Sequence, residues 1–157
     1  MKTLILYYSR TGITRKVAET IQEKMKCDLE EIIDLKNRKG PLGFIVSGKD
    51  SVMKKLTEIK QIQKNPSDYD LVILGTPVWA STMSCAMRTC LRQYRDKFRN
   101  IAFFCTTGGT GITNTFNHME QECGKKPLAT MGLKASLVKK GRFMEEVSQF
   151  IRKISGS

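Results

Sequence analysis

Short apolar runs alternate along the chain with segments whose apolar residues recur every three or four positions. The runs at Thr3–Tyr8, Asp70–Gly75 and Asn100–Cys105 have the length and continuous hydrophobicity of buried parallel strands. Each run opens into a small, polar or glycine-bearing loop, and a helical pattern follows. In the first helix the apolar positions are Ile13, Val17, Ile21 and Met25.

The remaining segments continue this alternation. We expect further strands at 29–35 and 128–136, a basic glycine-bearing loop at 36–50, a short helix at 51–59 and a polar link at 65–67. Later helices are expected around Met83–Tyr94, from Ile112, and at Phe143–Ile154. Strand and helix alternate five times, which predicts one doubly wound α/β domain over residues 1–157, with a five-stranded parallel sheet and helices on both faces.

Size and composition agree with a single domain. The 157 residues suffice for one core, and no internal repeat or linker interrupts them. No apolar run is long enough for a signal peptide or a membrane span, so we expect a cytoplasmic protein with no membrane partner. The five cysteines form no Cys-x-x-Cys pair and only one histidine, His118, is present, so no metal site is expected. The cysteines are interpreted as reduced core residues, with Cys105 near a loop.

The loop after the first strand has the chemistry of an anion cradle. Ser9, Thr11 and Thr14 supply hydroxyls, Gly12 permits close approach, and a helix begins directly afterwards. The Gly-Lys-Ser/Thr of a Walker loop, the dinucleotide Gly-x-Gly-x-x-Gly and the Cys/Arg spacing of a cysteine phosphatase loop are all absent. The loop therefore predicts a mononucleotide phosphate site, and the alternative is an ordinary helix cap at Thr11 or Thr14.

Two further loops extend this candidate site. Thr76–Ala80 follows the second apolar run, and Thr106–Gly111 follows the third. The carboxyl ends of parallel strands gather at one edge of a sheet, where such folds bind ligands. The three loops are therefore expected to form one site.

With these three loops, the chain resembles the flavodoxin-like family of FMN-binding proteins over essentially its whole length. Flavodoxins carry a Ser/Thr-x-Thr-Gly-x-Thr loop after the first strand, which Ser9–Thr14 matches. The resemblance implies that FMN is the cofactor and that its 5′-phosphate is wrapped by Ser9, Arg10, Thr11, Gly12, Ile13 and Thr14. It implies that the flavin is contacted by Thr76, Pro77, Val78, Trp79 and Ala80 from the second loop. From the third loop it implies contacts with Thr106, Thr107, Gly108, Gly109 and Gly111.

The composition of these loops bears on the flavin. Trp79, the only tryptophan, can stack on the ring, or alternatively anchor the core. The loops contain no Asp or Glu, which predicts a hydroquinone potential less negative than that of acidic flavodoxins. The third loop has no aromatic residue between Thr106 and Ile112. One face of the ring is therefore expected to stay open to a substrate, a second subunit or a partner protein.

The chain is strongly basic. Lys and Arg number 27 against 15 Asp and Glu, a formal net charge of +12. Arg88, Arg92 and Arg95 recur at helical spacing and are expected to form one basic face. Nucleic-acid binding is not favoured, because no nucleic-acid module or interleaved aromatic residues accompany the charge. We expect an acidic redox-partner protein, with a homodimer left open.

The sequence favours a one-electron carrier between protein partners. The alternative is an FMN-dependent oxidoreductase of the quinone reductase type that acts on a small molecule. A third interpretation is a basic binding module that has lost its flavin. No residue near the loops is a candidate catalytic acid or base.

Overall fold

Five parallel strands form the central sheet of the computed structural model, which describes residues 1–156. They are β1 (Thr3–Tyr7), β2 (Asp28–Glu31), β3 (Leu71–Trp79), β5 (Asn100–Thr107) and β6 (Thr130–Lys134). Their order across the sheet is β2-β1-β3-β5-β6, and the short β4 (Thr82–Met83) pairs antiparallel with β3. The predicted α/β fold with a parallel sheet is confirmed, with β4 as an addition.

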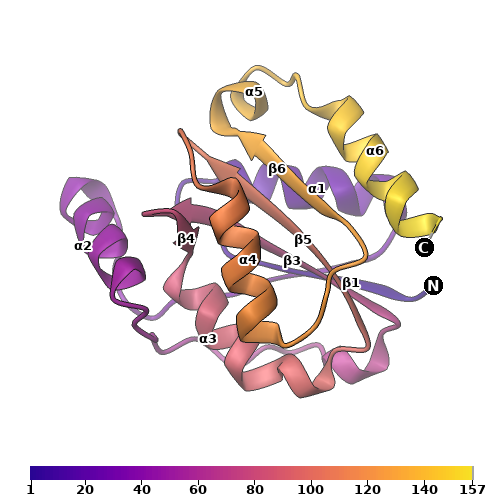
Figure 1. The fold of residues 1–157 in the computed structure, drawn as a ribbon, viewed down its shortest axis with the longest axis horizontal. Coiled ribbons are helices and arrows are strands. Elements are labelled where there is room, and N and C mark those ends of the chain that lie inside the picture. The colour runs from indigo at the N-terminus through magenta and orange to yellow at the C-terminus, as the bar shows by residue number, and fades with distance from the viewer. Residues whose placement is uncertain (157) are drawn as a thin grey trace.

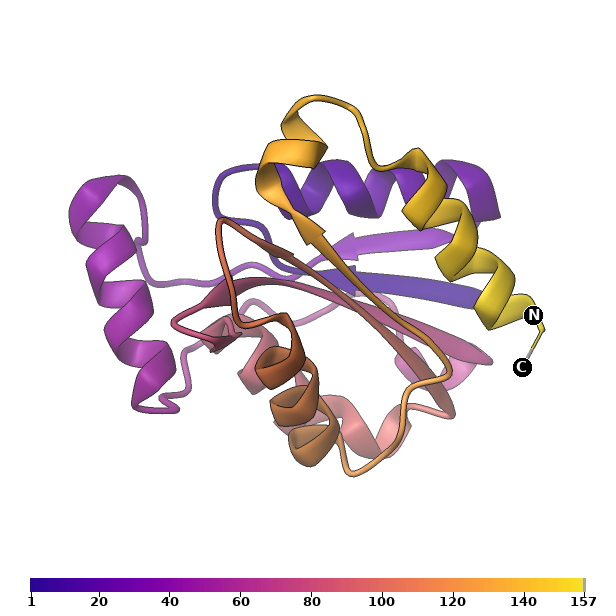
Figure 2. The ribbon, with the colours of Figure 1, turned by 45° about the horizontal axis from the view of Figure 1, so that its top comes forward.

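Helices cover both faces of the sheet (Figure 1). On one face lie α1 (Ile13–Met25), the short α5 (Ala135–Lys139) and α6 (Met144–Ser155). On the other lie α3 (Cys85–Tyr94) and α4 (Ile112–Cys123). Figure 2 shows these two layers from a second direction, with α2 (Gly40–Val52) standing apart at one end of the sheet. The short 3₁₀ turns Pro66–Asp68 and Arg95–Lys97 complete the connections.

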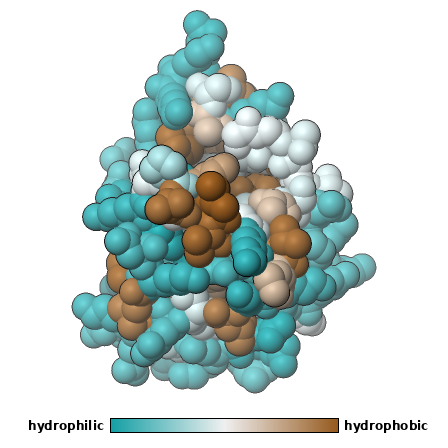
Figure 3. Space-filling view, turned by 90° about the vertical axis from the view of Figure 1, so that its left-hand side faces the viewer, coloured by the Kyte–Doolittle hydropathy of each residue, from teal (hydrophilic) through white to brown (hydrophobic). Residues whose placement is uncertain are grey.

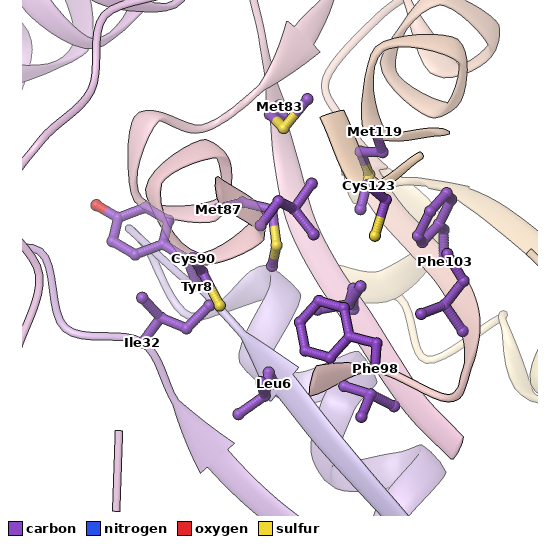
Figure 4. Packing of buried hydrophobic residues seen from close by; sticks show 14 of the residues in the cluster. Leu6, Tyr8, Ile32, Met83, Met87, Cys90, Phe98, Phe103, Met119 and Cys123 are labelled. Carbon is purple, nitrogen blue, oxygen red and sulfur yellow. The ribbon is translucent and has the colours of Figure 1, made fainter. Parts of the chain in front are cut away.

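The period-two alternation of β1 divides the core into two clusters. Leu4, Leu6 and Tyr8 point to the α3 and α4 side, whereas Ile5 and Tyr7 point to the α1 and α6 side. Figure 4 shows the first cluster, in which methionines and cysteines of α3 and α4 fill the space over β1 and β5. Burial on both faces explains why the central strands read as continuous apolar runs.

The segment 36–59 corrects the sequence prediction. It was expected as a loop followed by a helix at 51–59, but the helix α2 spans Gly40–Val52 and begins with Pro41 in its first turn. The residues that α2 buries are small or polar, namely Gly43, Ser47, Asp50 and Ser51. Hydrophobic periodicity could not reveal this helix, because its large apolar side chains face outward.

Other element bounds also differ from expectation. β2 ends at Glu31, and Asp34 forms only an isolated bridge with Ile59, so the strand expected at 29–35 is shorter. β3 continues to Trp79, so most of the expected second loop is strand, and Met83 belongs to β4. The final strand ends at Lys134 because Ala135–Lys139 form the unpredicted helix α5.

The arginines expected to form one basic face are not a free surface. Arg88 is only 1% exposed, and its Nη1 atom lies 2.6 Å from Oε1 of Glu122. The Nε atom of Arg92 lies 2.9 Å from Oε2 of the same carboxylate, and Arg95 donates to the Glu122 carbonyl. The expectation is therefore wrong for Arg88, since α4 supplies a carboxylate that the sequence spacing of α3 does not reveal.

All five cysteines are free thiols, and four of them are buried. Within residues 1–156, every helix is too short or too polar to traverse a lipid bilayer.

Candidate functional site

The first loop leaves the start of α1 open toward the sheet edge. Gly12 precedes the helix with φ 95°, a left-handed conformation that favours glycine. The Ser9 hydroxyl accepts a 3.0 Å hydrogen bond from the Gly12 amide and fixes the loop. No side chain caps α1, and no acidic residue lies in its first turn. Its first-turn amides and its dipole are therefore available to an anion.

A buried hydrogen bond joins the first loop to the third strand end. The hydroxyl oxygens of Thr14 and Thr106 lie 2.8 Å apart, although 92 residues separate them. Both side chains are buried. The pair fixes the spacing between α1 and β5, so the two loops are held as one unit.

The loops enclose a cavity of about 120 Å³. Ten of the predicted site residues line it: Arg10, Thr11, Ile13, Thr14, Pro77, Val78, Trp79, Thr106, Thr107 and Gly108. The sheet edge thus brings residues of all three predicted loops together. A phosphate group fits within this volume, and the rest of a bound flavin nucleotide would extend beyond it.

The other predicted site residues do not line this cavity. Ser9 and Gly12 shape the first loop, and the Gly109 amide donates to the Thr107 hydroxyl at 3.1 Å. Thr76 is buried, and its hydroxyl donates 2.9 Å to the Pro77 carbonyl. Ala80 and Gly111 lie farther along their loops, with Gly111 close against Ser81. We assign these six a supporting position.

Trp79 has aromatic and cationic neighbours on more than one side. Its indole is 6% exposed, and the Tyr8 ring lies edge-on with centroids 5.4 Å apart. The Arg38 guanidinium carbon lies 5.3 Å from the indole centroid. Burial, with a contribution from Asp34, raises the pKa of Tyr8 to about 12, so its phenol stays protonated. Trp79 therefore belongs both to the hydrophobic core cluster and to the wall of the cavity.

Two cavity residues were not anticipated. Phe44 of α2 and Ala135 of α5 both line it. The Arg10 guanidinium carbon lies 5.4 Å from the centre of the Phe44 ring, and Arg10 Nη1 donates to the Arg38 carbonyl at 3.4 Å. The third loop brings no aromatic residue, but α2 supplies one at the same cavity. No local signal in the sequence marked either residue.

The chemistry of the cavity suits an anion with an attached planar ring. Its lining holds one cationic side chain, Arg10, several hydroxyls and no carboxylate. Within residues 1–156, no group of three or more His, Cys, Asp or Glu is placed to hold a metal ion. Cys105 is fully buried, and burial raises its thiol pKa to about 12, so it stays protonated away from this lining. The site can bind and orient, but it offers no acid–base pair.

Comparison with known proteins agrees with this geometry. A flavoprotein from Lactobacillus acidophilus, solved in complex with FMN, is 26% identical to the chain, covers 88% of this chain and 97% of its own, and has a TM-score of 0.69. A Bacteroides uniformis protein described as a flavoprotein is 20% identical, covers 96% and 97%, and has a TM-score of 0.77. The NADH:FMN oxidoreductase EMOB, in its apo form, is 11% identical, covers 99% and 88%, and has a TM-score of 0.55. No curated protein sequence matches.

The family model for flavodoxin matches residues 2–153. The expected family and fold are confirmed by this match and by the structural relatives, and FMN is confirmed as the cofactor of the family. From residue 2 to residue 153, the chain belongs to the flavodoxin family.

Proposed function

We propose that this protein binds FMN at the loop cavity and transfers electrons between protein redox partners. The observation that carries the proposal is the convergence of three loops on one acid-free cavity, with the Thr14–Thr106 hydrogen bond holding two of them together. The FMN bound by the Lactobacillus acidophilus relative supports the choice of nucleotide.

The residues at the cavity fit this cofactor. The open first turn of α1 and the guanidinium of Arg10 would hold the 5′-phosphate, because helix amides and an arginine both favour a dianion. Trp79 and Phe44 would border the ring system with apolar surface. Bound FMN supplies the one- and two-electron chemistry, and the chain binds, orients and tunes it.

A carrier role is supported by what surrounds the cavity. No carboxylate or histidine lines it, so no general acid or base stands ready for a bound substrate. The absence of acidic lining also favours full reduction, since negative charge near the flavin would oppose the anionic hydroquinone. We therefore propose a hydroquinone potential less negative than that of acidic flavodoxins.

The partner we propose is an acidic protein that docks over α2. The outward side chains of this region form an apolar face (Figure 3), with exposed Leu42, Phe44, Ile45, Val52 and Met53. Exposed lysines lie on this helix and on either side of it, among them Lys39, Lys49 and Lys54. This face has an apolar centre surrounded by lysines. It would complement a partner surface that has an apolar centre surrounded by acidic residues. Phe44 reaches from this face to the cavity, which brings the partner close to the flavin.

A second candidate is an oxidoreductase that acts on a small molecule. One observation favours it: a separate donor-rich cavity lies beside the Ala80–Ser81 turn, next to the strand that lines the FMN cavity. The NADH:FMN oxidoreductase relative shares the fold only and does not decide between these activities.

FMN titration of the apo-protein tests cofactor binding. We expect one equivalent to bind, with quenching of both the flavin and the single tryptophan. Thr14→Val should weaken FMN binding about five- to tenfold, because the loss of a buried hydrogen bond costs about 1 kcal/mol and lets the loops separate. Thr20→Val, on the outer side of the same helix, is the matched control. Failure of FMN to bind would end the proposal.

Steady-state assays then separate the two candidates. A carrier should reduce a protein acceptor rapidly and show little turnover of NADH with a soluble quinone. Sustained turnover of NADH and quinone by the holoprotein would replace the carrier with the oxidoreductase. For a carrier with an acidic partner, raising the salt concentration should slow the exchange, since screening removes the steering field.

A further inference from the structure

A second cavity, of about 170 Å³, lies beside the turn that joins β3 to β4. Four parts of the chain meet there: Lys54 just after α2, the turn residues Ala80 and Ser81, Arg88 of α3, and His118 of α4. Both turn residues have positive φ, 48° and 62°, although neither is glycine. Such strain persists only where the surroundings hold the backbone in place.

Arg88 brings an unpartnered donor to this region. Its Nη1 atom donates 2.6 Å to Glu122 and its Nη2 atom donates 3.1 Å to the Thr82 hydroxyl. Its Nε atom is buried and has no hydrogen-bond partner among the described residues. A buried guanidinium N–H without an acceptor carries a desolvation cost that a bound acceptor would remove.

His118 supplies a second donor at the same cavity. Its Nδ1 atom lies 2.8 Å from the Thr82 hydroxyl oxygen, which already accepts from Arg88. The Thr82 proton is then free to be donated to Nδ1, which leaves the imidazole proton on Nε2. Burial, Lys54 and Arg88 all lower the pKa of His118, so the ring is neutral at physiological pH.

The charge around the cavity is positive. Its lining contains Lys54 and Arg88 and no carboxylate. Glu122 is not among the lining residues and pairs with both Arg88 and Arg92, so one carboxylate faces two guanidinium groups. A cavity that is lined by cationic hydrogen-bond donors and contains no carboxylate favours the binding of an anion.

We propose that this cavity binds a small oxyanion, either a phosphate or a carboxylate group, between Arg88, His118 and Lys54. Its volume is large enough to admit such a group. The ligand is either a free ion or the anionic end of a small molecule whose remainder extends toward the Ala80–Ser81 turn. The inference does not depend on FMN.

The only histidine of the chain gives a local readout. Proton NMR of the His118 imidazole is recorded over a pH series with inorganic phosphate, with acetate, and with chloride at matched ionic strength. We expect phosphate or acetate to move the resonances saturably and to raise the His118 pKa by about half a unit to one unit, because an adjacent anion stabilises imidazolium. The ion that binds more tightly identifies the class of group.

Two exposed substitutions keep the test independent of folding. Asn114→Asp places a carboxylate at the cavity and should abolish the response, and Lys54→Gln should weaken binding several-fold. Lys49→Gln, on α2 but outside this lining, is the matched control and should bind as the parent does. His118 titrations that coincide in phosphate, acetate and chloride would overturn the proposal, as would equal weakening by Lys49→Gln and Lys54→Gln. Since FMN takes no part in this readout, its outcome is separate from that of the FMN titration.

Discussion

The guanidinium of Arg38 lies over the indole of Trp79, with 5.3 Å between the guanidinium carbon and the ring centroid. The same guanidinium is held by two carboxylates, with Nε 2.6 Å from Asp34 and Nη1 3.0 Å from Asp50. Asp50 belongs to α2, whereas Trp79 ends β3. One buried side chain therefore connects the outlying helix to the aromatic wall of the cofactor cavity.

Arg38→Met should destabilise the protein by about 3–5 kcal/mol, because it leaves the buried carboxylate of Asp34 without its cationic partner and leaves Asp50 with only its lysine partners. Urea unfolding followed by tryptophan fluorescence measures the change. Arg15→Gln is the control: it breaks an ion pair with Glu31 in which Arg15 is 48% exposed, and should cost at most about 1 kcal/mol. Equal losses for the two variants would contradict a structural role for the Arg38 network.

The stability of the fold should fall in acid through Glu122. Hydrogen bonds from Arg92 and Arg88 hold the pKa of Glu122 below its usual value. The unfolded chain therefore binds a proton more readily, and the stabilisation present at neutral pH is lost as the pH falls through the folded-state pKa. Urea midpoints measured between about pH 6 and pH 3, a range that spans the ordinary Glu pKa, should decline less steeply in Glu122→Gln. Parallel declines in the two proteins would exclude Glu122 as a source.

Two glycine substitutions should change stability in opposite directions. A Cβ at Gly75 would lie 2.0 Å from the Phe104 ring, and Phe104 is fully buried and cannot yield. Gly75→Ala should therefore cost about 1–3 kcal/mol. Gly48 lies in α2, where an added Cβ would meet nothing within 4 Å, and Gly48→Ala should stabilise by up to about 1 kcal/mol through helix propensity. Thermal unfolding of both variants decides this.

The apolar face of α2 should contribute little to folding. Leu42 is 79% exposed, so Leu42→Ser combined with Ile45→Ser should leave the free energy of unfolding within about 0.5 kcal/mol of the parent. The same pair should reduce electron exchange with an acidic partner. Ile73→Ala, in the buried centre of β3, is the contrast and should cost about 2–5 kcal/mol. A large loss of stability in the α2 variant would mean that this face is part of the core.

The sequence predicts correctly the elements in which apolar residues are buried and polar residues are exposed. It does not predict the elements that depart from this rule. The central strands are buried on both faces, so their apolar runs were unmistakable. The helix α2 buries the polar residues Ser47 and Asp50 and exposes the apolar Leu42. A method that looks for apolar residues at helical spacing on the buried face therefore does not recognise it. The helical spacing of Arg88, Arg92 and Arg95 predicts one basic face, but Arg88 is buried because it pairs with Glu122, which lies 34 residues further along the chain.

The site was predictable to the extent that it is local. Loops that follow parallel strands gather at one edge of the sheet, so their convergence follows from the shared direction of the strands. Phe44 and Ala135 reach the cavity through the placement of whole helices, which no short motif encodes. Thr14 lines the cavity, and its hydroxyl also hydrogen-bonds to that of Thr106, a contact set by the pairing of distant segments.

The position of β1 between β2 and β3 has a consequence for biosynthesis. Thr3 pairs with Leu71, so nearly half of the chain must leave the ribosome before the first strand acquires its second neighbour. Until then the nascent chain presents a hydrophobic strand with one open edge, the kind of edge that recruits chaperones or other chains. Once β3 has left the ribosome, it can pair with β1 and cover that open edge.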